Sequence, residues 1–300
     1  MKILLTGGTG QVGYEIIKSK PEGVDLIFPD RNQLDLSDYE SCKKTLLNNR
    51  PDWIINCGAY TAVDEAEKEF TICKKINSYA PKAFTEAINE INGNLLQIST
   101  DFVFDGNQKH PYQESQKKNP LSKYGFTKAL GEELIKKNIN NIRNATILRT
   151  SWVISPRGRN FVLTMLELHS KKKYIDVVSD QIGSPTSAAD LGKICWKIIK
   201  FKKKKNLPFI MHWSDAGMAS WFDIAVELGD IAKELKIIER KAIVNPIKST
   251  TYLTLAQRPK YSVLDTLNTS KMLDIKPSHW KENLRKILIE YQKIKNIYLS

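Results

Sequence analysis

The chain has 300 residues, of which 41% are hydrophobic, and it carries a formal net charge of +13. This length and composition fit one large α/β domain, alone or with a smaller appendage, and exclude a disordered chain. The lysine-rich runs 171–173 and 202–205 fall where helices are expected to end, and positive charge is favourable there because of the helix dipole. The runs lack the interleaved aromatic residues of a nucleic-acid surface, so we expect no nucleic-acid partner and no membrane partner.

Cysteine and histidine positions argue against a metal or a disulfide framework. The four cysteines form no C-x-x-C pair, and the four histidines have no metal-type spacing. We therefore expect a reducing, cytoplasmic location. The N-terminal apolar run covers only residues 3–5, too short for a signal peptide, and no segment approaches the length of a membrane span.

Short apolar runs alternate with helical patterns in the first half of the chain. Strands are predicted at residues 2–6, 24–28, 53–57, 95–99 and 145–149, and helices at 11–20, 38–49, 81–92 and 121–138. This alternation predicts an α/β fold with a Rossmann-like, doubly wound parallel sheet covered on both faces. The continuous apolar character of the strands fits such burial.

After residue 150 this rhythm loosens. Helices are predicted at 161–170, 188–201 and 221–235, strands at 175–178 and 209–213, and helix with loop over 241–300. We expect residues 1–150 to form an NAD(P)-binding Rossmann domain with returning segments near 174–213. A smaller, mostly C-terminal substrate-binding region would then comprise residues 151–173 and 214–300.

A glycine-rich turn separates the first predicted strand from the first predicted helix. Gly7, Gly10 and Gly13 follow the spacing G-x-x-G-x-x-G. Free N–H groups and the dipole at the start of a helix favour a pyrophosphate, so this turn, with Gln11 and Val12, predicts a dinucleotide site. A glycine-rich turn without a ligand is the alternative.

Charged residues after the second predicted strand bear on the choice of coenzyme. At this place an acid such as Asp30 usually binds the adenosine ribose hydroxyls, while an arginine such as Arg31 can accommodate a 2′-phosphate. Because both residues are present, the sequence does not decide between NADH and NADPH as the coenzyme. Asp35 and Leu36 could reach the adenine, although an aspartate near a turn is as often a turn former.

Tyr124 and Lys128 lie four residues apart at the start of a predicted helix, which places them on one face. A nearby ammonium favours the phenolate and so lowers the pKa of a tyrosine from its usual value of about 10, and the lysine can also hold the nicotinamide ribose. Ser99 and Thr100 lie at the end of a predicted strand, where doubly wound sheets bind their ligands. We expect Thr100 to supply a hydroxyl beside the reacting oxygen, with Ser99 as the alternative.

These motifs and several longer strings resemble the dTDP-4-dehydrorhamnose reductase family of extended short-chain dehydrogenases/reductases. The strings are IINCGAYTAVDEAE (54–67), STDFVFDG (99–106), PYQE (111–114), LRTSW (148–152), DQIGSPT (180–186) and AQRPKYSVLD (256–265). The likeness covers nearly the whole chain and is far more specific than the glycine turn alone.

The resemblance implies hydride transfer from NADPH or NADH to C4 of dTDP-4-dehydro-L-rhamnose, which gives dTDP-L-rhamnose. It implies that Tyr124 protonates the nascent alkoxide, that Lys128 tunes Tyr124, and that Thr100 binds the keto oxygen.

The resemblance also assigns a cofactor loop and a sugar pocket. The loop is Ala59, Tyr60 and Thr61, and the pocket residues are Val63, Thr100, Asp101, Phe102 and Trp152. Each has a structural alternative: Trp152 and Phe102 could be core aromatics, and Asp101 could simply cap the turn after Thr100. Arg258 could lie near the nucleotide diphosphate or be a surface cation.

Some members of this family bind magnesium at a dimer interface through three glutamates. Glu15 matches the first and Glu290 the last, but the middle position falls near Ala189, beside Asp190. Because the set is incomplete, we predict no metal. We expect a monomer or a homodimer that binds a nucleotide-sugar substrate.

Two other functions stay open. The chain could reduce or epimerise another nucleotide sugar. It could also be a non-catalytic regulatory subunit, since the beta subunit of methionine adenosyltransferase resembles the same family. The presence of Thr100, Tyr124 and Lys128 favours an enzyme.

Overall fold

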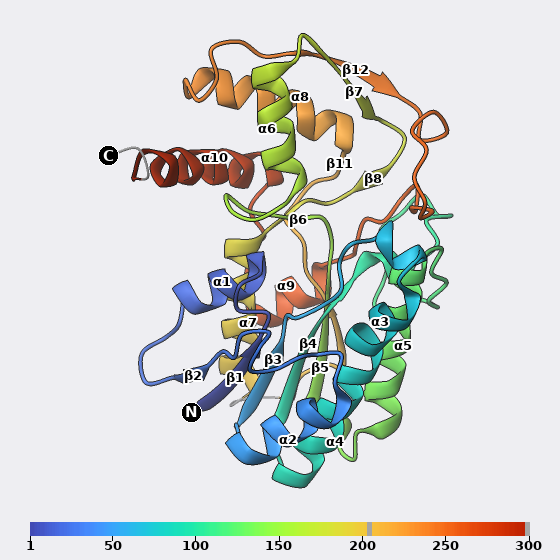
Figure 1. Cartoon of the computed structure of the whole chain (residues 1–300), viewed down its shortest axis with the longest axis vertical. Coiled ribbons are helices and arrows are strands. Elements are labelled where there is room, and N and C mark those ends of the chain that lie inside the picture. The colour runs from blue at the N-terminus through green and yellow to red at the C-terminus, as the bar shows by residue number, and fades with distance from the viewer. Residues whose placement is uncertain (203–205, 298–300) are drawn as a thin grey trace.

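A parallel sheet with helices on both faces forms one half of the protein, and a smaller, mainly helical lobe forms the other (Figure 1). The computed structural model describes residues 1–202 and 206–297, so Lys203, Lys204 and Lys205 of the predicted helix-end run lie outside the described residues. Among the described residues, no helix is long and apolar enough to cross a membrane.

The larger half contains six parallel strands in the order β10-β5-β4-β3-β1-β2. Its strands are β1 (Lys2–Thr6), β2 (Asp25–Ile27), β3 (Trp53–Asn56), β4 (Asn94–Thr100), β5 (Ala145–Thr150) and β10 (Ile210–His212). Its α-helices are α1 (Gln11–Lys18), α2 (Tyr39–Asn49), α3 (Phe70–Lys74), α4 (Ala80–Ile91), α5 (Lys123–Asn138), α7 (Ala188–Lys202) and α9 (Leu267–Leu273). The short helical turns are the 3-10 turns η1 (Glu65–Glu67), η3 (Asp101–Val103) and η4 (Ile142–Asn144) and the π-helical turn η2 (Lys75–Tyr79). The predicted Rossmann-like fold class is confirmed, and the predicted strands and helices of this half begin and end within a few residues of the observed ones.

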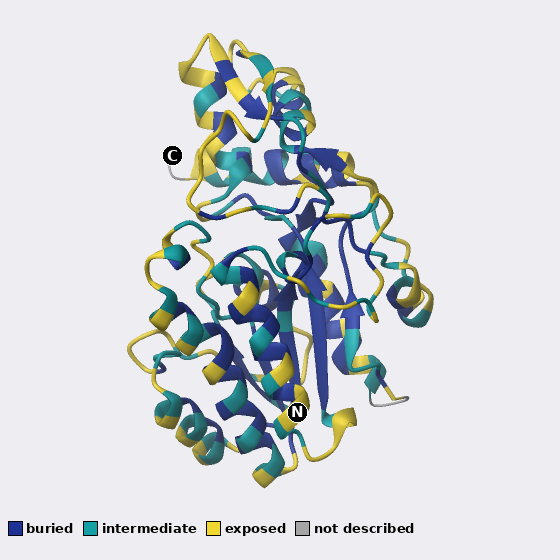
Figure 2. Cartoon of the chain, turned by 90° about the vertical axis from the view of Figure 1, so that its right-hand side faces the viewer, coloured by how far each residue is buried: buried dark blue, intermediate teal, exposed yellow. Residues whose placement is uncertain are grey.

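Alternate residues of the central strands pack on opposite faces of the sheet. On β1, Ile3 and Leu5 contact the core formed with α1 and α7, whereas Leu4 contacts the core formed with α2 and α4. All three side chains are fully buried. Burial on both faces explains why the strand runs are continuously apolar rather than alternating with polar residues, and Figure 2 shows these strands as the buried centre of the molecule.

The smaller lobe is assembled from segments after residue 150. Its elements are β6 (Val153–Ile154), α6 (Phe161–Lys171), β7 (Tyr174–Val178), β8 (Ile182–Gly183), β9 (Thr186–Ser187), β11 (Ala219–Ser220), α8 (Trp221–Glu234), β12 (Ile243–Ile247) and α10 (Trp280–Ile297). A second apolar core joins α6, α8 and α10, with Leu228 and Leu284 completely buried in it.

Two features of this region differ from the sequence-based expectation. β7 pairs in parallel with β12, outside the six-stranded sheet, so the return to the larger half begins at α7 and not near residue 174. β12 itself is a strand where helix and loop were expected. Its partner lies far away in the sequence, and pairing of that kind leaves no local pattern to read.

A buried ion pair ties α5 to the sheet beneath it. On α5, Glu132 accepts hydrogen bonds from Arg149 of β5, at 2.9 Å from Nε and 2.7 Å from Nη2, and a third from the Ser99 hydroxyl of β4 at 2.5 Å. The Arg149 and Glu132 side chains are only 1% and 2% exposed. The charge of Arg149 holds the pKa of Glu132 below its usual value, although burial alone would raise it.

We predict that Glu132→Gln lowers the free energy of unfolding by about 3–5 kcal/mol, because it leaves the Arg149 charge buried without its counter-charge. Guanidinium denaturation at neutral pH measures this. The matched control is Glu133→Gln, whose carboxylate is 64% exposed and pairs with Lys118 at 3.4 Å. That control should change stability by less than about 1 kcal/mol; equal losses in the two variants would contradict the prediction.

Candidate functional site

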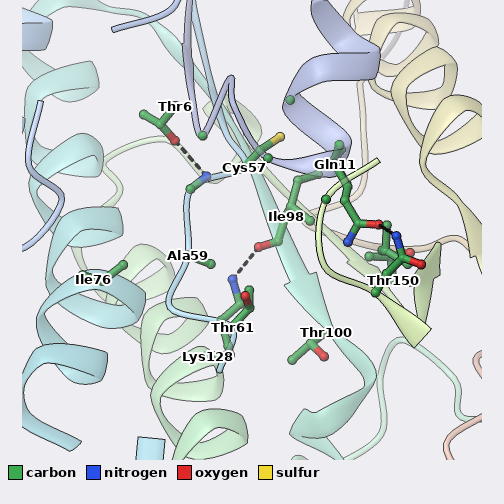
Figure 3. A pocket seen from close by; sticks show the side chains of 18 of the residues that line it. Thr6, Gln11, Cys57, Ala59, Thr61, Ile76, Ile98, Thr100, Lys128 and Thr150 are labelled. Carbon is green, nitrogen blue, oxygen red and sulfur yellow. Dashed lines mark hydrogen bonds between the residues drawn. The ribbon is translucent and has the colours of Figure 1, made fainter. Parts of the chain in front are cut away.

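A cavity of about 890 Å³ lies at the carboxyl ends of the parallel strands, and Figure 3 shows side chains that line it. Doubly wound sheets bind ligands at this edge. Its walls are the glycine turn before α1, the loops after β2 and β3, the end of β4, the start of α5, residues 150–154 and 158–161, Trp221 and Arg258. The volume lies near the upper end of the range typical of small-molecule sites.

Steric contacts explain the glycine turn. A Cβ on Gly13 would lie 2.1 Å from the carbonyl oxygen of Gly7, and Gly7 itself has a positive φ of +70°. Only glycine permits this turn and this close approach. Gly10 is the N-cap of α1, and no side chain caps the helix. The turn therefore presents free backbone N–H groups to the cavity, and a dinucleotide fits this cradle.

Asp30 and Asp35 line the cavity beyond β2, together with Arg31 and Leu36. Both carboxylates also shape their own turns. Asp30 accepts hydrogen bonds from the backbone N–H groups of residues 32 and 33, and Asp35 accepts one from that of residue 37. That last bond lowers the pKa of Asp35. The turn-forming and cavity-lining interpretations therefore describe the same side chains.

The loop after β3 reaches the cavity through only part of the predicted segment. Ala59 and Thr61 line it, as does Val63. Tyr60 is not among the lining residues: its hydroxyl donates to Glu69 at 2.6 Å, and its backbone is bonded twice to Asn77. These bonds direct the Tyr60 ring away from the cavity.

Thr100, the last residue of β4, places its hydroxyl at the cavity. Its Oγ1 accepts from the backbone N–H of Phe102 at 3.2 Å and donates to Asp101 Oδ1 at 3.0 Å. The cap of this turn is therefore Thr100, not Asp101 as the alternative held. Asp101 is buried, and burial raises its pKa to about 6. Ser99, the alternative to Thr100, is bonded to Glu132 instead.

Tyr124 is brought against the end of β4 by the residue that follows it. A Cβ on Gly125 would lie 2.2 Å from the carbonyl oxygen of Phe102, so glycine allows the first turn of α5 to touch this loop. The rings of Phe102 and Tyr124 then meet edge to face, 5.7 Å apart. Ser122 caps the helix by accepting from the Gly125 N–H. Thr100, Asp101, Phe102, Tyr124 and Lys128 thus share one wall of the cavity.

Burial governs the ionisation of both residues of the Tyr–Lys pair. Burial raises the pKa of Tyr124, while a hydrogen bond with Thr100 works in the opposite direction. The lowering of this pKa by Lys128 that the sequence predicted is therefore wrong for this structure, because the effect of burial is the larger one. Burial lowers the pKa of Lys128 to about 8, while the charge of Glu132 opposes that shift. The Lys128 Nζ donates to the Ile98 carbonyl oxygen at 2.7 Å (Figure 3). The phenol is therefore protonated at neutral pH, and the amine can change protonation near it.

Trp152 lines the cavity in a backbone conformation that non-glycine residues seldom adopt, with φ of +43°. Its ring stacks on Trp221, with centroids 3.6 Å apart and an angle of 4° between the planes. A Cβ on Gly183 would lie 2.5 Å from the indole, so glycine lets this backbone approach the ring. This packing offsets a backbone cost of about 1–3 kcal/mol, so Trp152 is both a packed aromatic and a cavity wall.

Several lining residues carried no signal in the sequence. Arg159, Asn160, Phe161 and Trp221 all face the cavity. Trp221 follows the capping box of α8 at Ser220, a pattern that indicates where a helix starts and nothing about ligands.

The described residues do not fit the three-glutamate magnesium site that the resemblance suggested. Lys18 donates to Glu290 and lies 4.0 Å from Glu15, so an ammonium already lies beside both carboxylates. Asp190 accepts from Lys193 and Asn283 instead. Among the described residues, no group of three or more potential ligands could hold a metal.

Comparison with known proteins extends the similarity over both lobes. The family model described as the RmlD substrate binding domain matches residues 1–293. The dTDP-4-dehydrorhamnose reductase of Aggregatibacter actinomycetemcomitans is 34% identical over 290 residues, which cover 95% of this chain and 98% of that protein. The spore coat polysaccharide biosynthesis protein SpsK of Bacillus subtilis is 36% identical over 293 residues, covering 96% and 97% of the two chains. A solved dTDP-4-dehydrorhamnose reductase from Bacillus anthracis, in complex with NADP, superposes with a TM-score of 0.88 at 33% identity and covers 96% of this chain and 99% of that one.

We predict that Lys128 loses its proton near pH 8, because burial disfavours its charged form. Only a neutral amine reacts with acetic anhydride, so Lys128 should be acetylated at lower pH than exposed lysines, whose usual pKa is about 10.4. Mass spectrometry of peptides labelled across a pH series measures the midpoint. A midpoint shared with the exposed lysines would contradict the prediction.

Proposed function

The chain belongs to the family described as the RmlD substrate binding domain, and from that membership we propose that it reduces the C4 keto group of dTDP-4-dehydro-L-rhamnose with NADPH or NADH. It is an NAD(P)-dependent oxidoreductase, and the product is dTDP-L-rhamnose. The observation that carries this proposal is the placement of Thr100, Tyr124 and Lys128 in the same cavity as the glycine turn.

The glycine turn and the loop after β2 would hold the coenzyme. Free N–H groups at the start of α1, with Gln11 and Val12, would bind its pyrophosphate. Asp30 would bind the adenosine ribose hydroxyls and Arg31 a 2′-phosphate, while Asp35, Leu36, Ala59 and Thr61 would border the adenine and ribose. When bound, the reduced nicotinamide supplies the hydride.

Residues of the chain would bind the keto oxygen and supply the proton for the alkoxide. Thr100 Oγ1 is held at the end of β4 by the Phe102 N–H, and its hydroxyl would turn its single proton from Asp101 Oδ1 to the keto oxygen. As the C–H bond forms at C4, the electron pair of the C=O bond moves to oxygen, and Tyr124 would protonate that alkoxide. A phenol whose pKa is raised by burial is protonated at neutral pH and can act as this acid. Lys128 would hold the nicotinamide ribose and tune Tyr124.

The sugar would lie between the two lobes. Val63, Asp101, Phe102 and Trp152 line the cavity beside Thr100, on segments that come from both sides of the cleft. We assign the six-stranded sheet with its helices to coenzyme binding and the smaller lobe to substrate binding. The protein would act as a monomer or homodimer, and its four unpaired thiols favour a reducing cytoplasm.

The alternatives are less well supported. A reductase or epimerase of another nucleotide sugar would use the same Tyr–Lys pair, and a regulatory subunit would need none of it. The buried, hydrogen-bonded placement of Thr100 and Lys128 favours catalysis.

The direct test is oxidation of NADPH or NADH by the purified protein with dTDP-4-dehydro-L-rhamnose, followed by nicotinamide absorbance. We expect turnover for the wild-type protein. Tyr124→Phe should lower kcat about 10³-fold, because it removes the proton donor, while NADPH binding measured by fluorescence stays within about twofold.

The matched control is Tyr39→Phe, since Tyr39 lies on α2 outside the cavity. Its turnover should equal that of the wild type. No turnover by the wild type would overturn the proposed substrate, and unchanged turnover in Tyr124→Phe would overturn the proposed acid.

A further inference from the structure

The loop formed by residues 155–160 joins β6 to α6 and rests on the first turn of α1. Asn160 Nδ2 donates to Gln11 Oε1 at 3.1 Å, a contact that Figure 3 shows at the Gln11 side chain. A Cβ on Gly158 would lie 3.5 Å from Gln11 Cγ. The Arg157 guanidinium lies 4.6 Å from the centroid of the Tyr14 ring. A segment that leads into the smaller lobe therefore covers the helix end that follows the glycine turn.

The shape of this loop is determined by its own hydrogen bonds. Ser155 Oγ accepts from the Arg157 N–H and donates to the Arg157 carbonyl oxygen. Asn160 Nδ2 donates to the carbonyl oxygens of both residues, and its Oδ1 caps α6. Gly158 turns the chain with φ of +71°. The loop is thus a preformed support for Arg159, which is exposed and lines the cavity.

Arg159 differs from the other cations that line the cavity, which are Arg31, Lys128 and Arg258. Arg258 is bound by Asp64 at 2.5 Å, and Lys128 is bound by the Ile98 carbonyl. Arg31, like Arg159, makes no hydrogen bond or ion pair among the described residues, but it follows β2, in the loop that the proposed function assigns to the adenosine half of the coenzyme. Within the described part of the chain, the Arg159 side chain makes no hydrogen bond or ion pair, so its charge is available at the glycine turn.

We propose that Arg159 binds the pyrophosphate of the nicotinamide dinucleotide from the side of the smaller lobe, opposite the backbone N–H groups of the glycine turn. The inference rests on the proposed function, because it concerns that coenzyme. A guanidinium presents a planar set of donors that matches two phosphate oxygens. The anion would then be bound by both lobes, and the Asn160–Gln11 bond holds the two binding elements together.

The test is direct coenzyme binding, measured by nicotinamide fluorescence for NADPH and for NADH. Arg159→Ala should raise the Kd of both coenzymes by the same factor, about tenfold, which corresponds to one lost hydrogen bond to a charged group. Arg159→Lys, which keeps the charge, should recover part of the loss. Raised salt should weaken wild-type binding more than binding by Arg159→Ala.

Three comparisons make the result decisive. Arg240→Ala removes the same charge from an exposed position outside the cavity and should leave both Kd values unchanged. Binding of dTDP alone, measured by calorimetry, should be unchanged in Arg159→Ala. A loss confined to NADPH would overturn the proposal in favour of the 2′-phosphate, and a loss of dTDP binding would overturn it in favour of the substrate diphosphate.

The two proposals fail in different ways. Wild-type protein that binds neither coenzyme would overturn the proposed function itself. Wild-type binding that Arg159→Ala matches would overturn only the role of Arg159.

Discussion

The buried pair of Glu132 and Arg149 is the interaction around which the site is organised. Glu132 is two helical turns after Tyr124 and one after Lys128, so the three side chains share a face of α5. Its carboxylate also accepts hydrogen bonds from Ser99, the neighbour of Thr100 on β4, and from Arg149, the second-last residue of β5. Removing two charges from water is costly, and the cost is offset here only because every partner is in place. The helix carrying the Tyr–Lys pair is thereby held in register with both strands that end at the cavity.

That pair extends into a wider buried polar network. Arg149 Nη1 also donates to the Glu114 carbonyl oxygen and lies 3.3 Å from His212 Nε2. His212 Nδ1 donates to the Tyr112 carbonyl oxygen, so in the neutral imidazole Nε2 accepts the hydrogen bond from Arg149. Burial and the charge of Arg149 lower the pKa of His212 to about 3, so this imidazole is neutral. A neutral histidine lets the arginine keep its full complement of acceptors without a second buried cation.

Burial determines the protonation of the groups that face the cavity. It raises the pKa of Tyr124 and of Asp101 and lowers that of Lys128. Each shift disfavours the charged form, which is the general effect of removing an ionisable group from water. The site therefore presents a protonated phenol beside an amine whose proton is weakly held, and this combination suits the delivery of a proton to an alkoxide.

The sequence by itself determined the Rossmann-like sheet, the approximate bounds of its strands and of most of its helices, and the glycine turn, and it predicted Thr100, Tyr124 and Lys128 as site residues, because each depends on local periodicity or on spacing within a single segment. It indicated the family as well, since the matching strings run along nearly the whole chain. Only the tertiary structure decided that β7 pairs with β12, that the Tyr60 ring is directed toward Glu69, and that Trp152 stacks on Trp221. It alone placed the loop carrying Arg159 on the first turn of α1. These features join residues far apart in the chain, or depend on competing side-chain partners, and neither leaves a periodic trace in the sequence.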